Sequence, residues 1–419
     1  MTFRPSGPAL HPHDLTIPEP GSTTARTVLT GALGRLLREV QTIGRGFPAS
    51  PAMQQDLHQF HVLRQELNTK QRGALPSFVA RTPIGTLVRC ARQQPSETIL
   101  REFLALVYFE LARLGALETP IRQKCPPQRI LSLAGRISIT LPADVQSILY
   151  APGKLVVELL SGPVELALDP YDDKPAGYSQ SVGGLVVEKP YYSIDKNIVL
   201  ALADNNPLSM FEAHPDKQGN ALDLGGKSAT EWTNVLRDGL QLITTMLPDL
   251  RAEMDLFVQQ IVPVGFDEHK HLSASYQEAI GTIYMSLHPS LMTMTEALIH
   301  EFSHNKINAL FELDGVLENA FSPLYASPVR PDPRPLHGVL LAVHAFLPVA
   351  RLYEKMVESG HSLAKNPAFL GRFAKIRQIN AEGAEVVLQH GRPTPVGKPL
   401  LDEIRRWDDY FGRFARASS

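Results

Sequence analysis

Residues 296–313 read EALIHEFSHNKINALFEL, and the interpretation of the C-terminal half of the chain depends on this stretch. An α-helix turns by about 100° per residue, so His300 and His304 share one face, roughly 6 Å apart along the axis. Two imidazoles at this spacing can bind one divalent metal ion, and Glu301 is placed to face the same cleft. We therefore predict a metal-binding helix in which Glu301 is a catalytic residue.

The segments around this motif predict two strands and a series of helices. Residues 254–266 (MDLFVQQIVPVGF) and 279–287 (AIGTIYMSL) are short, apolar and rich in β-forming side chains, so each predicts a strand. Thr293 and Glu296 have the T-x-x-E spacing of a capping box, which places the start of the motif helix. Apolar residues at three- and four-residue spacing predict helices over 229–249, 293–313, 336–358, 366–390 and 398–416.

This order of strand, metal-motif helix and further helices resembles the core of zincin-type metalloproteins, in which a strand forms one lip of the cleft. If the arrangement holds, residues 281–287 offer a sheet edge to which an extended peptide adds by main-chain hydrogen bonds. A peptide is then the expected substrate, and Tyr284 and Tyr325 are candidate substrate-binding residues.

The rest of the chain divides into regions that differ in composition and in the spacing of apolar residues. Residues 1–23 are rich in Pro and Ser and are predicted to be a flexible N-terminus. Residues 24–120 have the apolar spacing of helices. Over 121–210, short Ile-, Val- and Tyr-rich segments alternate with Gly, Pro and Asp and predict a β-rich region. The fold class is therefore α+β, with a zincin-like strand, the metal-motif helix and a helical C-terminal part forming the catalytic region over 211–419.

Composition excludes several classes of protein. The chain has 419 residues and a formal net charge of −2, so the basic excess typical of nucleic-acid binders is missing. Cys90 and Cys125 are too few for a disulfide framework or a multi-cysteine zinc site. The N-terminus lacks the apolar region of a signal peptide, and no run of 18 apolar residues occurs. We expect a cytoplasmic protein with neither a nucleic-acid nor a membrane partner.

Two histidines leave the metal shell incomplete, so a third protein ligand is required. The metzincin extension is excluded, because Ile307 and Leu310 occupy the positions of its glycine and third histidine. A gluzincin-type Glu would come from a later position, and Glu312, Glu318 and Glu354 are the candidates.

The next predicted helix offers a competing pair of ligands. His337 and His344 lie seven residues apart in RPLHGVLLAVHAFLPVARLY, so they share one helix face. An imidazole from this face would complete the site. We favour His344 slightly over His337, because His344 lies in the middle of the helix, where its position is more rigid.

The run EALIHEFSHNKINALFEL, followed by SPVRPDPRPLHGVLLAVHAF (residues 327–346), resembles the HExxH-motif peptide-modification proteins, described as α-ketoglutarate-dependent HExxH-type peptide β-hydroxylases. They are associated with gene clusters for ribosomally made, post-translationally modified peptides. The resemblance is strongest over 280–356. In the family pattern as we read it, some relatives carry the downstream histidine where this chain has Leu341, one turn from both His337 and His344.

The resemblance implies a zincin-like fold that uses non-haem Fe(II), 2-oxoglutarate and O₂ to hydroxylate a side-chain β-carbon of a peptide. His300 and His304 would then ligate iron together with a histidine of the 337–344 segment. The distal carboxylate of 2-oxoglutarate requires a cationic partner, preferably a bidentate one. The candidates for this cationic partner are Arg334, Arg330 and Lys306. The two arginines flank a rigid Pro-Asp-Pro segment.

Two other functions remain open. In a zinc metallopeptidase, Glu301 would act as general base toward a metal-bound water. In a metal-stabilised binding protein, the same ligands would have no catalytic task. A precursor peptide or carrier protein is a possible partner of the N-terminal regions.

Two further motifs carry less weight. Gly225-Gly226-Lys227-Ser228 ends like a P-loop, but Ala221 replaces the first glycine of that motif, so we interpret it as a turn. Residues 267–271 (DEHKH) contain potential metal ligands, yet a charge-rich solvated loop is the simpler interpretation.

Overall fold

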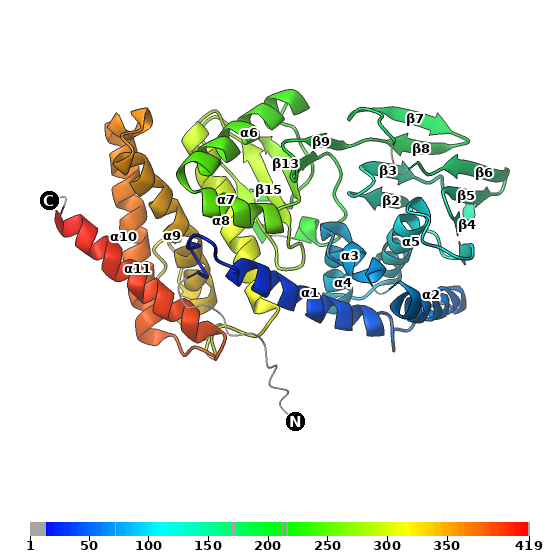
Figure 1. Ribbon diagram of the computed structural model, residues 1–419, viewed down its shortest axis with the longest axis horizontal. Helices are drawn as coiled ribbons and strands as arrows, with labels where there is room; N and C mark the ends of the chain where they lie inside the picture. Colours follow the sequence, from blue (N-terminus) through cyan, green and yellow to red (C-terminus); the bar gives the residue numbers. More distant parts are fainter. Residues whose placement is uncertain (1–13, 72, 170–171, 212, 215–216, 418–419) are drawn as a thin grey trace.

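The computed structural model describes residues 14–417 except 72, 170–171, 212 and 215–216 (Figure 1). The chain is a mixed α+β protein with helices toward both ends and sheets in the middle, as the sequence predicts. Figure 1 shows an elongated molecule: the last helices form one end, a central sheet with its covering helices forms the middle, and helices α2–α5 with two small sheets form the other end.

Five helices open the described chain. Gly115 follows the last of them and has a positive φ, as is common for the residue just after a helix. Ser96 caps this last helix, because its hydroxyl accepts a hydrogen bond from the Ile99 N–H. The helices are α1 (Thr24–Thr42), α2 (Pro51–Lys70), α3 (Ala74–Val79), α4 (Thr82–Gln93) and α5 (Glu97–Arg113).

The predicted β-rich region forms two four-stranded antiparallel sheets, in the orders β1-β4-β5-β6 and β2-β3-β8-β7. Tyr150 and Ile148 of the first sheet point into the same core as the helices, and both are fully buried. The strands are β1 (Ile121–Gln123), β2 (Arg129–Ser132), β3 (Ile137–Thr140), β4 (Val145–Ala151), β5 (Lys154–Leu159), β6 (Gly162–Ala167), β7 (Ser179–Val182) and β8 (Leu185–Glu188).

A five-stranded central sheet has the order β14-β15-β13-β10-β9. The strands β10, β13 and β15 run parallel, while β9 and β14 pair antiparallel at the two edges. Its members are β9 (Tyr191–Ser193), β10 (Val199–Ala201), β13 (Gln260–Phe266), β14 (Ser273–Ala274) and β15 (Thr282–Leu287). Between β10 and β13 lie the short η1 (Ser209–Phe211), β11 (Ala213–His214) and β12 (Lys217–Gln218), then helices α6 (Ala229–Met246) and α7 (Pro248–Phe257).

The remaining chain is helical, as predicted, apart from one short ribbon. The elements are α8 (Leu291–Phe311), β16 (Leu324–Tyr325), β17 (Arg334–Pro335), α9 (Leu336–Glu358), η2 (Ser362–Lys365), α10 (Pro367–His390) and α11 (Gly397–Ala417). Among the described residues, α9 alone is long and apolar enough to cross a membrane, but 72% of its most apolar window is buried, as in the core helix of a soluble protein.

The buried apolar residues form two main cores. Residues of the predicted helical region (24–120) and β-rich region (121–210) share one of them, which runs from Leu36 to Leu185. A second core joins the start of the described chain to the central sheet and the C-terminal helices. Helix α1 spans both cores and runs along the lower side of the view in Figure 1.

The structure differs from the sequence-based expectations at two places. Residues 14–17 belong to the predicted flexible N-terminus, yet all four side chains are buried; residues 1–13 lie outside the described residues. The strand predicted over 254–266 begins only at Gln260, because Pro248 starts a new helix whose apolar face, with Leu250 and Met254, is buried.

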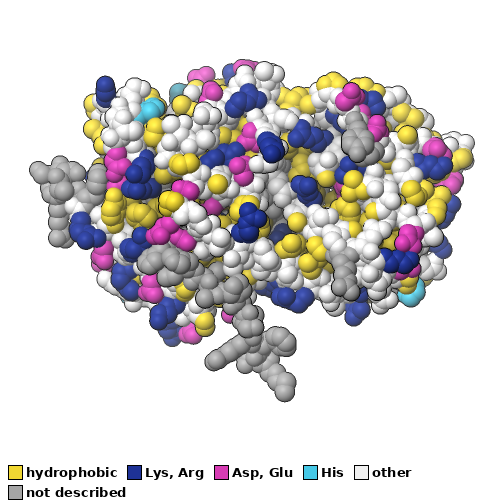
Figure 2. Space-filling view, in the orientation of Figure 1, with side chains coloured by type: hydrophobic (Ala, Val, Ile, Leu, Met, Phe, Trp, Pro, Cys, Tyr) yellow, Lys and Arg dark blue, Asp and Glu magenta, His cyan; other side chains and the backbone are white. Residues whose placement is uncertain are grey.

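Basic and acidic side chains are interspersed over the face of the molecule shown in Figure 2. This mixture agrees with the small net charge of −2.

Candidate metal centre

Helix α8 carries the metal motif and is buried along most of its length. Its N-cap is Ser290, whose hydroxyl accepts from the Thr293 N–H at 3.3 Å. The predicted capping box of Thr293 and Glu296 is therefore wrong, because an earlier serine already satisfies the first turn. Glu296 instead accepts hydrogen bonds from Nε and Nη2 of Arg372 of α10.

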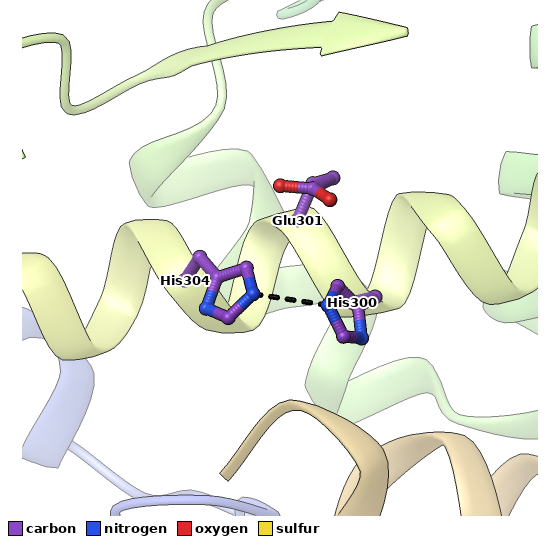
Figure 3. Close-up of side chains that lie close together, drawn as sticks. All are labelled: His300, Glu301 and His304. Atoms are coloured by element: carbon purple, nitrogen blue, oxygen red, sulfur yellow. Dashed lines mark hydrogen bonds between the residues drawn. The ribbon is translucent and has the colours of Figure 1, made fainter. Parts of the chain in front are cut away.

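His300 and His304 face each other across one turn of α8 (Figure 3). Their Nε2 atoms lie 3.0 Å apart, and their ring centroids lie 4.6 Å apart. Two nitrogens bound to one ion at about 2.1 Å are separated by roughly 3.0–3.4 Å, depending on the ligand geometry. The pair therefore fits a single divalent transition-metal ion.

Both imidazoles are neutral at physiological pH. Burial lowers the pKa of His304 to about 4. Burial also lowers the pKa of His300, and the nearby charges of His304 and Arg372 add to this effect. Only a neutral imidazole has a lone pair for a metal, so the surroundings hold both side chains in the form that binds.

Glu301 completes a group whose potential ligand atoms all lie within 4.8 Å of one another. Its carboxylate is buried and accepts a hydrogen bond of 2.7 Å from the hydroxyl of Ser273. Ser273 belongs to β14, the edge strand of the central sheet, and Figure 3 shows Glu301 on the side of α8 that faces the strand drawn above it. This carboxylate is thus fixed between the metal pair and the sheet edge.

Asn305, the residue after the second histidine, ties α8 to the central sheet. Its Oδ1 accepts from the Gly281 N–H at 2.6 Å, and its Nδ2 donates to the carbonyl of Glu301 at 2.9 Å. Nδ2 also contacts the carbonyl of Thr282 and the hydroxyl of Ser275. Fully buried and bonded on both sides, Asn305 sets the position of the metal helix beneath the sheet.

His344 lies on α9. Its charge opposes protonation of His300, and the charge of His304 opposes protonation of His344. Its Nε2 lies 3.0 Å from the carbonyl oxygen of Leu15, and a carbonyl only accepts, so Nε2 carries the proton. The lone pair is therefore on Nδ1, which is buried and has no hydrogen-bond partner among the described residues. Metal-binding histidines commonly donate their second nitrogen to a carbonyl in this way.

The other proposed ligands have different surroundings. His337 packs between the rings of Phe311 and Phe321, with centroid distances of 4.9 and 5.2 Å. Glu354 is fully buried, and its carboxylate bonds to Tyr410 and Arg351. The group of atoms within 4.8 Å contains none of His337, His344 and Glu354, so the third ligand stays a prediction.

The two acidic residues that follow the metal motif most closely in sequence, Glu312 and Glu318, have partners away from the histidine pair. Glu312 is buried and pairs with Arg92, with one Oε–Nη distance of 2.8 Å. Glu318 is exposed, 3.9 Å from Arg392. Neither belongs to the group of potential ligands around His300.

The three cations proposed for 2-oxoglutarate also have partners or lie in solvent. Lys306 is buried and donates to Glu253 at 2.6 Å and to the Asp14 carbonyl at 2.8 Å, so its charge is used within the protein. Arg334 pairs with Asp332 at 3.0 Å. Arg330 is exposed. The assignment of Lys306 is corrected, because a lysine two residues past His304 faces a different side of the helix.

Two predictions about the substrate-binding region, the sheet edge over 281–287 and the role of Tyr284, are wrong. The predicted edge over 281–287 corresponds to β15 (Thr282–Leu287), which is not an edge, because it pairs with β13 on one side and β14 on the other. Tyr284 is fully buried, and its hydroxyl donates to Asp204 at 2.9 Å, so it does not face a cleft. Tyr325 stacks on the ring of His390 of α10, with a centroid distance of 4.6 Å.

Two residues near the metal pair were missed by sequence reasoning. His271, in the segment interpreted as a solvated loop, is largely buried; burial lowers its pKa to about 4, and its charge acts on His300. Arg372 bonds to Glu296 across 76 residues of sequence. His271 belongs to the DEHKH run, whose potential metal ligands were a signal that we set aside, whereas no local motif marks Arg372.

In the comparisons with known proteins, no family model and no curated protein matches this chain.

Proposed function

We propose that this protein is a non-haem Fe(II)- and 2-oxoglutarate-dependent oxygenase that hydroxylates a side-chain β-carbon of a peptide. The observation that carries a metal-dependent reaction is the pair of neutral imidazoles of His300 and His304, whose Nε2 atoms lie 3.0 Å apart. The choice of iron and of 2-oxoglutarate rests on the resemblance of residues 296–313 and 327–346 to the peptide β-hydroxylases.

His344 is the third ligand that we favour. Its Nε2–H donates a hydrogen bond to the Leu15 carbonyl, which fixes the ring. The lone pair of Nδ1 is therefore available inside the protein. His337 is the alternative, although its ring is packed between two phenylalanines. A set of three imidazoles leaves positions for the keto acid and O₂ on a six-coordinate ion.

When bound, Fe(II) supplies the oxidising chemistry that inserts one atom of O₂ into a C–H bond while 2-oxoglutarate is converted to succinate and CO₂. The chain contributes the ligands and the positioning groups. Arg334 and Arg330 stay the candidate partners for the distal carboxylate of the keto acid. The charge of Arg372 acts on His300, but its guanidinium is already bound to Glu296. An arginine suits this task because its two parallel donors match a carboxylate.

The peptide is proposed to lie along β14. This strand is antiparallel to β15 and forms the sheet edge, so its outer side can accept main-chain hydrogen bonds from an extended chain. Ser273 of β14 also holds Glu301, so a peptide at this edge lies beside the metal helix.

A zinc metallopeptidase is the second candidate, and the position of Glu301 favours it. A buried carboxylate in the same group as the two histidines, held by Ser273, is suited to take a proton from a water molecule attacking a peptide bond. The oxygenase gives this carboxylate no comparable task.

One set of assays separates the two functions. Protein reconstituted with Fe(II) without oxygen is expected to develop the visible absorption of an Fe(II)–keto-acid chelate when 2-oxoglutarate is added. Admission of O₂ with candidate peptides should then yield succinate and a peptide heavier by one oxygen atom. His300→Ala and His304→Ala should abolish both signals, whereas His58→Ala, an exposed histidine of α2, should not. Cleavage of peptides with Zn(II) in the absence of 2-oxoglutarate would instead establish the peptidase.

A further inference from the structure

A cavity of about 220 Å³ lies between α1, α7 and the junction of α3 with α4. Apolar side chains form most of its wall, among them Leu33 and Leu36 of α1 and Phe257 of α7. It shares no residue with the His300–Glu301–His304 group. Its volume corresponds to roughly seven water molecules, so it suits a small molecule and not a nucleotide or a folded partner.

Arg89 of α4 is the charged group inside this cavity. The residue is only 5% exposed, and its guanidinium has five N–H donors. Among the described residues it makes an ion pair with Glu312, 3.7 Å from its Nε, but no hydrogen bond, and its Nε is buried without a hydrogen-bond partner. Glu312 is already bound by both terminal nitrogens of Arg92. A buried guanidinium with so few satisfied donors requires an explanation.

The other polar groups of the cavity strengthen the case for an anion. Arg26 and Arg81 line it as well and are exposed, so they lie toward solvent while Arg89 is inside. None of the described residues that line the cavity is an Asp or a Glu. Three cations in the lining, no acid among the lining residues and an apolar wall together favour a ligand with a negative head and an apolar body.

We propose that this cavity binds a small organic carboxylate, with the carboxylate on the guanidinium of Arg89 and the apolar part against Leu33, Leu36 and Phe257. The match is chemical, because an arginine fork forms two parallel hydrogen bonds to one carboxylate and a buried pair of this kind is strong. The proposal does not depend on the metal, on the oxygenase reaction or on its substrate.

The test uses the full-length protein and defined probes. Hexanoate and benzoate are titrated by calorimetry and by thermal shift, with hexanol and benzyl alcohol as uncharged counterparts and inorganic phosphate as a charged probe without an apolar body. The two carboxylates should bind at one site and raise the unfolding temperature, whereas the alcohols and phosphate should bind at least about tenfold more weakly.

Two variants act on the cavity from different sides. Arg89→Met removes the cation, and Leu33→Trp fills the apolar part while leaving Arg89 in place; each should weaken carboxylate binding by at least about tenfold. Arg405→Met, an exposed arginine of α11 paired with Asp402, is the matched control and should bind like the unaltered protein. Circular dichroism verifies that each variant is folded.

Three results would overturn the proposal: equal binding of the alcohols, unchanged binding by folded Arg89→Met, or no binding of either carboxylate to the unaltered protein. His300→Ala should bind the carboxylates normally, so failure of the proposed metal chemistry and failure of this site are distinguishable.

Discussion

His344 donates its Nε2–H to the carbonyl oxygen of Leu15, 3.0 Å away, across 329 residues of sequence. The bond joins the start of the described chain to the helix that follows the metal motif. It sets the tautomer of His344 and leaves the Nδ1 lone pair inside the protein, where burial lowers the pKa of the imidazole to about 3. The N-terminal segment thereby holds the ring of the histidine that we propose as the third ligand.

The first prediction concerns the third ligand. His344→Ala should lower the affinity for Fe(II) or Zn(II) by at least about tenfold, because one ligand and its carbonyl support are lost. His337→Ala should change the affinity by less than about threefold, since that ring is held by two phenylalanines. Metal titration with a competing chelator gives both values. The reverse ranking of the two variants would identify His337 as the ligand.

The second prediction concerns Glu301. Glu301→Gln retains an oxygen that can accept the hydrogen bond from Ser273, so the fold and the metal affinity should be preserved. Succinate formation should remain within about tenfold of the unaltered protein if the reaction is oxidative, whereas a peptidase would lose about 10² to 10⁴ in rate. Ser273→Ala, which keeps the carboxylate, is the matched variant. A loss of succinate formation in Glu301→Gln with full metal loading would show that the carboxylate has a role in the oxygenase.

The third prediction concerns Glu403 of α11, which holds the N-terminal segment. Its carboxylate accepts hydrogen bonds from the N–H groups of Leu15 at 2.6 Å, Thr16 at 3.0 Å and Ile17 at 3.3 Å, and from the Thr16 hydroxyl. Glu403→Gln turns one acceptor oxygen into a donor that faces these N–H groups. It should cost about 3 kcal/mol of unfolding free energy, measured in urea.

The neighbouring Asp402→Asn is the control for Glu403→Gln. Asp402 is exposed and pairs with Arg405 at 3.4 Å, so this change should cost less than about 1 kcal/mol. Equal stability of the two variants would show that the N-terminal segment is not held by Glu403. Faster proteolysis near residue 15 in Glu403→Gln, but not in Asp402→Asn, would show that Glu403 holds the N-terminal segment.

The fourth prediction concerns pH and Glu312, the residue that ends α8. Burial raises the pKa of this carboxyl, but the hydrogen bonds of Arg92 and the charges of Arg89, Arg92 and Arg35 outweigh it and bring the pKa below its ordinary value of 4.5. A depressed pKa stabilises the fold above the unfolded value, and the contribution is lost as pH falls through the lower folded value. The chain should therefore lose stability below about pH 4.5.

Glu312→Gln tests this assignment. It should cost about 3 kcal/mol at neutral pH, because three arginines lose a buried counter-charge, and stability should fall less steeply with acid than in the unaltered protein. Glu318→Gln removes an exposed carboxylate that lies 3.9 Å from Arg392, and its pH profile should match the unaltered one. If the stability of both variants and of the unaltered protein fell equally steeply with decreasing pH, the role given to Glu312 would be contradicted.

The sequence alone determined the features that depend on local spacing. The four-residue separation of His300 and His304 is enough to bring two imidazoles together, because any helix places i and i+4 on one face. The helical C-terminal part and the β-rich middle also follow from apolar periodicity. The predicted helix over 336–358 has the same bounds in the structure.

Tertiary structure decided everything that depends on which segments meet. The order of the elements predicted that residues 281–287 form a sheet edge, but β14 pairs beside β15 and forms that edge, and Tyr284 is buried. Arg372 bonds to Glu296 of the metal helix α8, and Leu15 bonds to His344 of the next helix, α9. No local pattern in the sequence marks either contact. Hydrogen bonds within one helix repeat with a fixed period, whereas contacts between segments depend on how complete surfaces pack, and a period in the sequence does not contain that information.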